Sequence, residues 1–129
     1  MCGIVAVTGY KKALPLLMNG LEKLEYRGYD SAGIAVINPE TNVICCNKAE
    51  GKLNNLKDNL NHKNIPGTVG IAHTRWATHG KPEVKNAHPH IDSSGAIAVV
   101  QNGIIENFQD LKNKLENCLL YTSDAADES

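Results

Sequence analysis

Two kinds of segment alternate along this chain, and their order restricts the folds it can adopt. Short runs rich in β-branched residues predict strands, and leucines three or four residues apart predict helices. The predicted strands cover 3–8, 32–37, 43–47, 69–73 and 96–101, and the predicted helices cover 13–26, 53–60 and a segment from Phe108. The turn at 38–42 makes a hairpin of its two strands, and hairpins build antiparallel sheets. We therefore expect an α+β fold, with helices packed on a face of an antiparallel sheet.

Length and composition are those of one soluble domain. The chain has 129 residues, of which 42% are hydrophobic and 21% charged, as in globular proteins. The net charge is −1 and the basic residues are scattered, which argues against nucleic acid or a membrane surface as a partner. No apolar run is long enough to span a bilayer, and we expect no signal peptide. Four cysteines without ligand or disulfide spacing favour a reducing, cytoplasmic compartment.

Cys2 is the first candidate for chemistry. It follows the initiator methionine and precedes Gly3, and a small second residue favours removal of Met1. The new N-terminus would carry both a thiol and an α-amine, whose reference pKa of about 7.7–8.0 suits a base. This is the N-terminal-nucleophile arrangement. The alternative is a small buried residue at the start of a strand.

Asn102-Gly103 ends the last predicted strand. Such a pair is usually only a turn. The asparagine amide and the glycine N–H could also point at one oxygen and stabilise its negative charge, as in an oxyanion hole. From these two residues alone, the turn is the better interpretation.

A dense polar cluster covers residues 73–80 and leads into a loop without periodicity at 77–94. Arg75 is one of only two arginines in the chain and could clamp a carboxylate bidentately. Trp76 could cover a site, and Thr78 and His79 add hydrogen-bonding groups. Equally, Arg75 could pair with a structural carboxylate and Trp76 could lie in the core.

Histidines and cysteines elsewhere leave a metal site open as a minor alternative. The histidines at 73, 79, 88 and 90, with the pair Cys45-Cys46, would supply enough ligands, but no standard zinc spacing is present. We expect no metal and no cofactor. On a strand, Cys45 and Cys46 should point to opposite faces, one into the core.

Two further features concern the N-terminus of the chain and the start of the last helix. Arg27 and Asp30 lie in a glycine-punctuated turn, where they either pair with each other or hold the chain terminus near Cys2. Asn107 is expected to cap the last helix, with Asp110 three residues further on.

Taken together, these segments resemble the glutamine–fructose-6-phosphate aminotransferase family, in its N-terminal class II glutaminase domain. The resemblance covers residues 1–117 and rests on the start at Cys2, the segment 24–33, the segment 70–80, Asn86–His90 and Gln101–Asn107. It implies an N-terminal nucleophile hydrolase fold, a four-layer α-β-β-α sandwich of which only the first part is present. Amidophosphoribosyltransferase is the nearest rival.

The resemblance also implies roles. Cys2 would attack the side-chain amide of glutamine, while Asn102 and Gly103 hold the oxyanion. Arg75 would bind the substrate carboxylate. Trp76, Thr78 and His79 would belong to the loop that closes over glutamine, and Arg27 would position the N-terminus.

In the full enzyme of that family, ammonia would pass to a second domain that makes glucosamine 6-phosphate from fructose 6-phosphate, in a homo-oligomer. Residues 118–129 do not resemble the family, and we expect them to be a truncation artefact. Asp124 and Asp127 therefore take over no role from the family's acidic residue, which binds the substrate amine. We expect the truncated chain alone to be inactive.

Overall fold

The computed structural model describes residues 2–61, 63–76 and 80–118, with the side chain of Arg27 excepted. Four strands form its main sheet: β1 (Gly3–Val7), β2 (Ser31–Ile37), β3 (Ile44–Glu50) and β4 (Gly70–Arg75). Their order is β1-β4-β2-β3, and every neighbouring pair is antiparallel. Gly3 lies opposite Thr74, and Ser31 lies opposite Arg75. The start of the chain therefore meets the start of β2 and the end of β4 at one end of the sheet.

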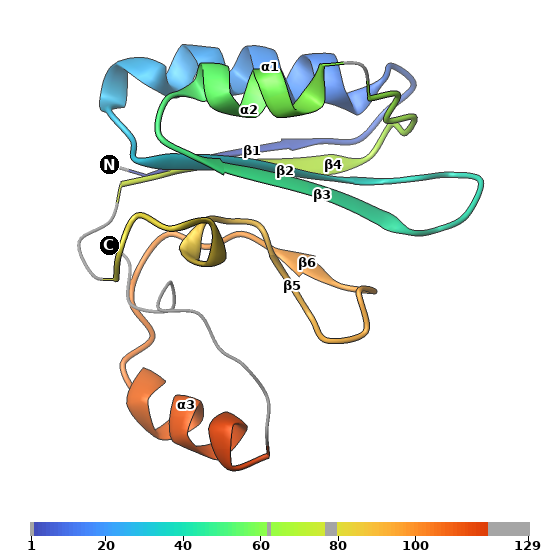
Figure 1. The fold of residues 1–129 in the computed structure, drawn as a ribbon. Coiled ribbons are helices and arrows are strands. Elements are labelled where there is room, and N and C mark those ends of the chain that lie inside the picture. The colour runs from blue at the N-terminus through green and yellow to red at the C-terminus, as the bar shows by residue number, and fades with distance from the viewer. Residues whose placement is uncertain (1, 62, 77–79, 119–129) are drawn as a thin grey trace.

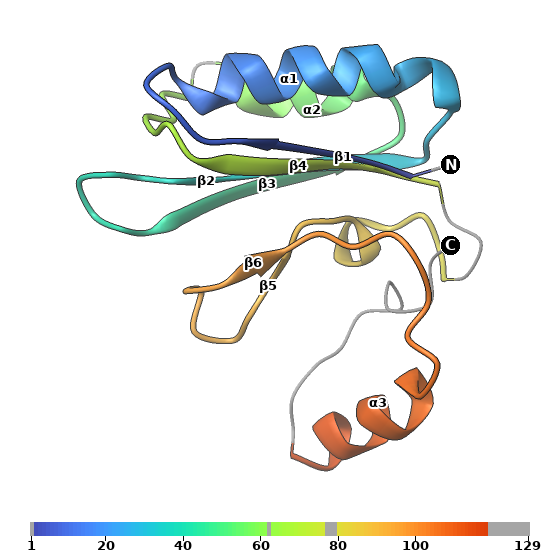
Figure 2. The same cartoon turned by 180° about the vertical axis from the view of Figure 1, so that it is seen from behind.

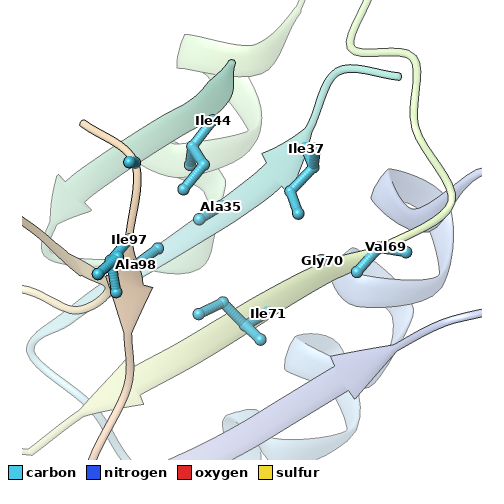
Figure 3. Close-up of a pocket in the computed structure, with 9 residues that line it drawn as sticks. Ala35, Ile37, Ile44, Val69, Gly70, Ile71, Ile97 and Ala98 are labelled. Carbon is cyan, nitrogen blue, oxygen red and sulfur yellow. The ribbon is translucent and has the colours of Figure 1, made fainter. Parts of the chain in front are cut away.

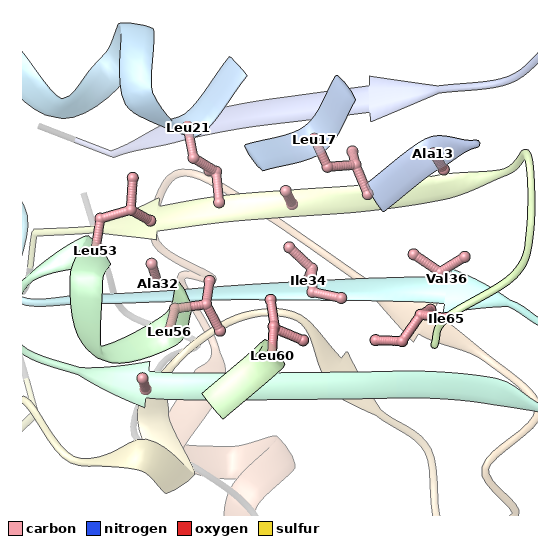
Figure 4. Close-up of a cluster of buried hydrophobic side chains, with 12 residues drawn as sticks. Ala13, Leu17, Leu21, Ala32, Ile34, Val36, Leu53, Leu56, Leu60 and Ile65 are labelled. Carbon is pink, nitrogen blue, oxygen red and sulfur yellow. The ribbon is translucent and has the colours of Figure 1, made fainter. Parts of the chain in front are cut away.

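Helices α1 (Ala13–Leu24) and α2 (Leu53–Leu60) cover one face of this sheet (Figure 1). Leu17, Leu21, Leu53 and Leu56 are buried against alternate residues of the strands, including Ile34 (Figure 4). A fully buried leucine contributes about 1.5–3 kcal/mol to folding, so these residues account for much of the stability of this face. An ion pair between Lys57 and Glu22 links the two helices at the surface.

The other face of the sheet is covered by the later part of the chain. The short hairpin of β5 (His90–Ile91) and β6 (Ala98–Val99) lies under it, preceded by a 3-10 turn, η2 (Val84–Asn86). Helix α3 (Phe108–Asn117) lies beyond the hairpin, and none of its residues is buried (Figures 1 and 2). The layers thus run helix, sheet, hairpin, helix.

Gly33 lets this second layer approach the sheet. A Cβ atom at Gly33 would lie 2.1 Å from the carbonyl oxygen of His88, far inside any allowed contact. The absence of a side chain at this one position of β2 therefore permits the backbone of the 86–90 segment to rest directly on the strand.

Most of the predicted elements are confirmed, with differences at their ends. The first helix stops at Leu24 and gives way to a 3-10 turn, η1 (Glu25–Arg27), before Gly28, whose φ of 77° favours glycine. The strand predicted at 69–73 continues to Arg75, and the loop predicted at 77–94 contains β5. The strand predicted at 96–101 shortens to Ala98–Val99, because pairing ends there and the chain bends toward Asn102.

The predicted cap of the last helix is wrong. Asn107 stands at the N-cap position, but its side chain makes no capping hydrogen bond. Its φ of −99° and ψ of 28° lie outside the extended region from which a cap side chain reaches the first free N–H groups. The prediction for Cys45 and Cys46 holds: Cys45 packs against the core, and Cys46 Sγ lies 4.0 Å from the carbonyl oxygen of Pro89 in the opposite layer.

Among the described residues, no helix is both long and apolar enough to cross a membrane.

Candidate active site

Cys2 lies at the end of the sheet where β1 begins and β4 ends. Its side chain is 5% exposed. The Trp76 backbone N–H donates to Cys2 Sγ at 3.3 Å, and the Trp76 carbonyl oxygen lies 3.7 Å from the same sulfur. The Cys2 thiol is therefore held on both sides by the backbone of Trp76.

The side chain of Asn102, 100 residues further along the chain, also lies beside Cys2. Its Nδ2 donates to the Cys2 carbonyl oxygen at 3.4 Å, and its Oδ1 lies 2.7 Å from Nε2 of His73. Gly103 follows with a φ of 130°, a conformation that side chains rarely adopt. The turn at 102–103 therefore stands directly beside Cys2.

Three histidines cluster behind this turn, and two of them are stacked. The rings of His73 and His88 are 4.2 Å apart and nearly parallel, and His90 lies 4.4 Å from His88. The Gln101 N–H donates to Nδ1 of His88 at 3.4 Å. Burial, followed by the nearby His88, lowers the pKa of His90 to about 3, so His90 is neutral at neutral pH.

Arg75 is fully buried at the end of β4 and contacts protein groups. Its Nη1 donates to the Lys81 carbonyl oxygen at 3.0 Å and lies 3.8 Å from Oδ1 of Asp30. The Asn86 amide donates to the same carbonyl at 2.9 Å, and the Asp30 N–H donates to the Arg75 carbonyl oxygen at 2.7 Å. Arg75 thus ties the start of β2 to the segment that returns from the loop.

Trp76 is 48% exposed, so it lies at the surface beside Cys2 and not in the core. A Cβ atom at Gly28 would lie 3.3 Å from its ring, which places the indole against the turn that follows η1. Thr78 and His79 lie outside the described residues. The backbone of Arg27 lies in η1, and its side chain is also outside the description.

The structure therefore brings together Cys2, Trp76 and Asn102, with Gly103 next to Asn102 in the chain. It places Arg75 one residue before Trp76, with its guanidinium among protein partners. From the sequence alone, His73 has no predicted catalytic role and Asp30 is not a predicted contact of Arg75. A signal for His73 was present: residues two apart on a strand share a face, and His73 and Arg75 are two apart on β4.

No metal site emerges from the residues that the structure describes, since no three of their His, Cys, Asp and Glu side chains are grouped to hold an ion. A cavity of about 280 Å³ lies away from Cys2, between the sheet and the hairpin (Figure 3). Its lining is apolar and includes Ala35, Ile37, Ile71 and Ile97, so it lacks the polar groups that would bind glutamine.

Two curated proteins similar to this chain carry the same name. Glutamine–fructose-6-phosphate aminotransferase (isomerising) of Clostridium tetani is 56% identical over 115 residues, which are 89% of this chain and 19% of that protein. The protein of the same name from Gloeobacter violaceus is 58% identical over 113 residues, 87% of this chain and 18% of its own length. The chain thus spans about a fifth of the length of these relatives. No family model matches it.

Solved structures similar to this chain carry related names. The glutamine phosphoribosylpyrophosphate amidotransferase from B. subtilis matches with a TM-score of 0.75 and 25% identity, over 95% of this chain and 26% of that one. A structure described as the allosteric regulatory enzyme of purine biosynthesis matches with a TM-score of 0.76 and 26% identity. The α+β fold, with the first part of a layered sandwich of the N-terminal nucleophile type, is confirmed.

Proposed function

This chain corresponds to the N-terminal part of the glutamine–fructose-6-phosphate aminotransferases, and from that premise we propose that it supplies the nucleophile for glutamine hydrolysis. The observation that supports this most directly is the position of Cys2 between the Trp76 N–H and the Asn102 amide. A thiol, a stabilising N–H and a second donor at one point are the parts that acyl transfer needs.

The proposed reaction has two stages. Cys2 Sγ attacks the side-chain carbonyl carbon of glutamine, and the α-amine of Cys2 takes the thiol proton once Met1 has been removed. The tetrahedral intermediate expels ammonia, which carries that proton away, and a thioester remains. Water then attacks the thioester carbonyl and releases glutamate, so that the thiol is restored.

The oxyanion of each tetrahedral intermediate is assigned to Asn102 and to the Gly103 N–H. Asn102 already directs its Nδ2 toward the Cys2 carbonyl, within one residue of the reacting sulfur. Donors fixed in place before the reaction lower its barrier because they need no reorientation when charge develops.

Substrate binding is assigned to Arg75, Trp76, Thr78 and His79, and positioning of the N-terminus to Arg27. For Arg75, binding the substrate would require a change in the structure. Its guanidinium contacts Asp30 and the Lys81 carbonyl, so binding a glutamine carboxylate would require the segment that contains Lys81 to rearrange. A loop that closes over the substrate would provide such a movement.

The activity of the complete protein extends the proposal further. Ammonia would aminate fructose 6-phosphate in a second domain and yield glucosamine 6-phosphate, in a cytoplasmic homo-oligomer without cofactor, as the family resemblance implies. Residues 1–117 would be the glutaminase segment, and 118–129 would lie outside the family sequence. Amidophosphoribosyltransferase remains the second candidate, and the much higher identity to the aminotransferases disfavours it.

Affinity labelling tests the proposal. A chloroketone analogue of glutamine should alkylate Cys2 of the complete protein, and peptide mass spectrometry would locate the label. Glutamine should protect against labelling, whereas asparagine, one methylene shorter, should not. Labelling of Cys45 or Cys46 at the same rate, or an absence of protection, would contradict the assignment of Cys2 as the nucleophile in a glutamine site.

A further inference from the structure

Asn102 is held from two sides, and the two contacts fix which way its side-chain amide faces. One end lies 3.4 Å from the Cys2 carbonyl oxygen, and the other lies 2.7 Å from Nε2 of His73. A backbone carbonyl only accepts hydrogen bonds, so the end that faces Cys2 must be the NH₂ group. The amide oxygen therefore faces His73, whose Nε2 must carry the donated proton.

His73 is itself held firmly in the main sheet, against His88 of the second layer. It is fully buried on β4, and its ring stacks on His88 at 4.2 Å with an interplanar angle of 23°. Nδ1 of His88 accepts the N–H of Gln101, the residue before Asn102. The stacked pair thus contacts the turn twice, once at the Asn102 side chain and once at the backbone beside it.

We propose that His73 is a positioning residue for the oxyanion turn, because its Nε2–H holds Asn102 Oδ1 and so directs the Asn102 NH₂ group toward Cys2. This rests on the proposed function, since it assigns a role within the same site. An asparagine amide free to rotate would spend part of its time with its oxygen toward the developing negative charge, where it repels. A fixed amide presents its donor throughout.

Three substitutions of His73 separate this role from a purely structural one. His73→Phe keeps a ring to stack on His88 but has no donor. His73→Asn has a donor that is too short to reach, whereas the longer side chain of His73→Gln can place an N–H near the position of Nε2. In the complete protein, we expect kcat for glutamine hydrolysis to fall about 10²-fold in the Phe and Asn variants, the effect of losing one oxyanion donor.

His73→Gln should recover activity to within about tenfold of the wild type, and KM for glutamine should change little in all three, since the ground-state amide needs the oxyanion donor less. An aldehyde analogue of glutamine, which forms a tetrahedral adduct with the thiol, should lose affinity in parallel with kcat. In an Asn102→Ala background, the same His73 substitutions should have no further effect.

The measurements are kcat, KM, the aldehyde inhibition constant and the melting temperature of each variant. Equal losses in His73→Gln and His73→Asn, or full additivity with Asn102→Ala, would overturn the inference. So would a normal kcat in a folded His73→Phe protein. A wild-type protein that does not hydrolyse glutamine would instead overturn the proposed function, and the inference with it.

Discussion

Arg75 has a proposed role in substrate binding, although its guanidinium is buried and in contact with protein groups. A planar guanidinium can hold the Lys81 carbonyl and approach Asp30, and it could grip a carboxylate once the segment that contains Lys81 has moved. The sequence analysis left open whether Arg75 pairs with a structural carboxylate or binds substrate. Asp30 supplies the structural contact, and the binding role stays a prediction.

Replacing Arg75 by lysine keeps the charge and removes the fork. We expect Arg75→Lys to lower kcat/KM for glutamine by a factor that corresponds to about 1.5–3 kcal/mol of lost transition-state stabilisation, the range for a hydrogen bond to a charged group. Steady-state kinetics and a melting curve on the complete protein would measure this. Lys85→Arg, at an exposed residue of η2, is a control that should behave as wild type. A lower melting temperature with unchanged kcat/KM would assign Arg75 a structural role only.

His90 predicts a pH dependence of stability. Its pKa in the folded protein is about 3, lowered by burial and then by His88, Lys48, His73 and Arg75. Between about pH 3 and pH 6.5 the unfolded chain therefore binds a proton that the folded chain does not, and stability falls as the pH falls through this window. Above the unfolded-state pKa of about 6.5, His90 is neutral in both states, and it then causes no loss of folding stability.

His90→Gln should remove this part of the dependence. The melting temperature of the complete protein between pH 7 and pH 4 should therefore fall less in the variant than in the wild type, with a difference of roughly a few degrees. Two parallel curves would show that His90 is protonated in the folded protein at the same pH as in the unfolded chain.

Among the elements, β2 determines how closely the two layers approach. Gly33 is in direct contact with the backbone of His88, and His88 in turn contacts His73 and Gln101. A side chain at Gly33 would push the 86–90 segment away from the sheet and move the histidines behind the turn at 102–103.

Gly33→Ala should therefore cost about 1–3 kcal/mol of stability, as overpacking does, and also lower kcat. Ala35→Val is the matched control. It lies two residues further along the same strand and adds bulk into the apolar cavity of Figure 3, so we expect less than about 1 kcal/mol of change. Denaturation and glutaminase assays on both variants compare the two positions. Equal behaviour would mean that the contact with His88 is not limiting.

Patterns with a short period were predictable from the sequence. The leucine spacing identified α1 and α2, and the β-branched runs identified the four strands of the main sheet. Contacts that join distant parts of the chain were not, because periodicity carries no information about which elements pair. The Cys2–Asn102 contact spans 100 positions, and only the family resemblance suggested it. Neither the periodicity nor the family resemblance indicated the hydrogen bond between His73 and Asn102.

At the scale of the whole molecule, the second layer is incomplete. Ile37, Val69, Ile97 and Val99 are each between 41% and 59% exposed, and each lies in or directly before a strand of the sheet or of the hairpin. None of the residues of α3 is buried. Natural monomers seldom leave large apolar patches open, and the relatives are about five times longer.

Residues 2–129 produced alone should therefore neither melt cooperatively nor release glutamate. Folding stability is only about 5–15 kcal/mol, so several apolar side chains left uncovered, at roughly 1.5–3 kcal/mol each, would exhaust it. Calorimetry and gel filtration of this fragment would test this. A monomer with a sharp transition would show that the segment is a folding unit.

We propose that Cys2, as the N-terminal residue, is the nucleophile of a glutaminase. The most direct measurement is glutamate release from glutamine by the complete protein in three forms: wild type, Cys2→Ala, and a form that retains Met1, with each N-terminus checked by mass spectrometry. We predict activity in the wild type alone, because the Ala variant lacks the thiol and the Met-retaining form lacks the free amine beside it. Normal glutamate release by either of the other two forms would contradict the account.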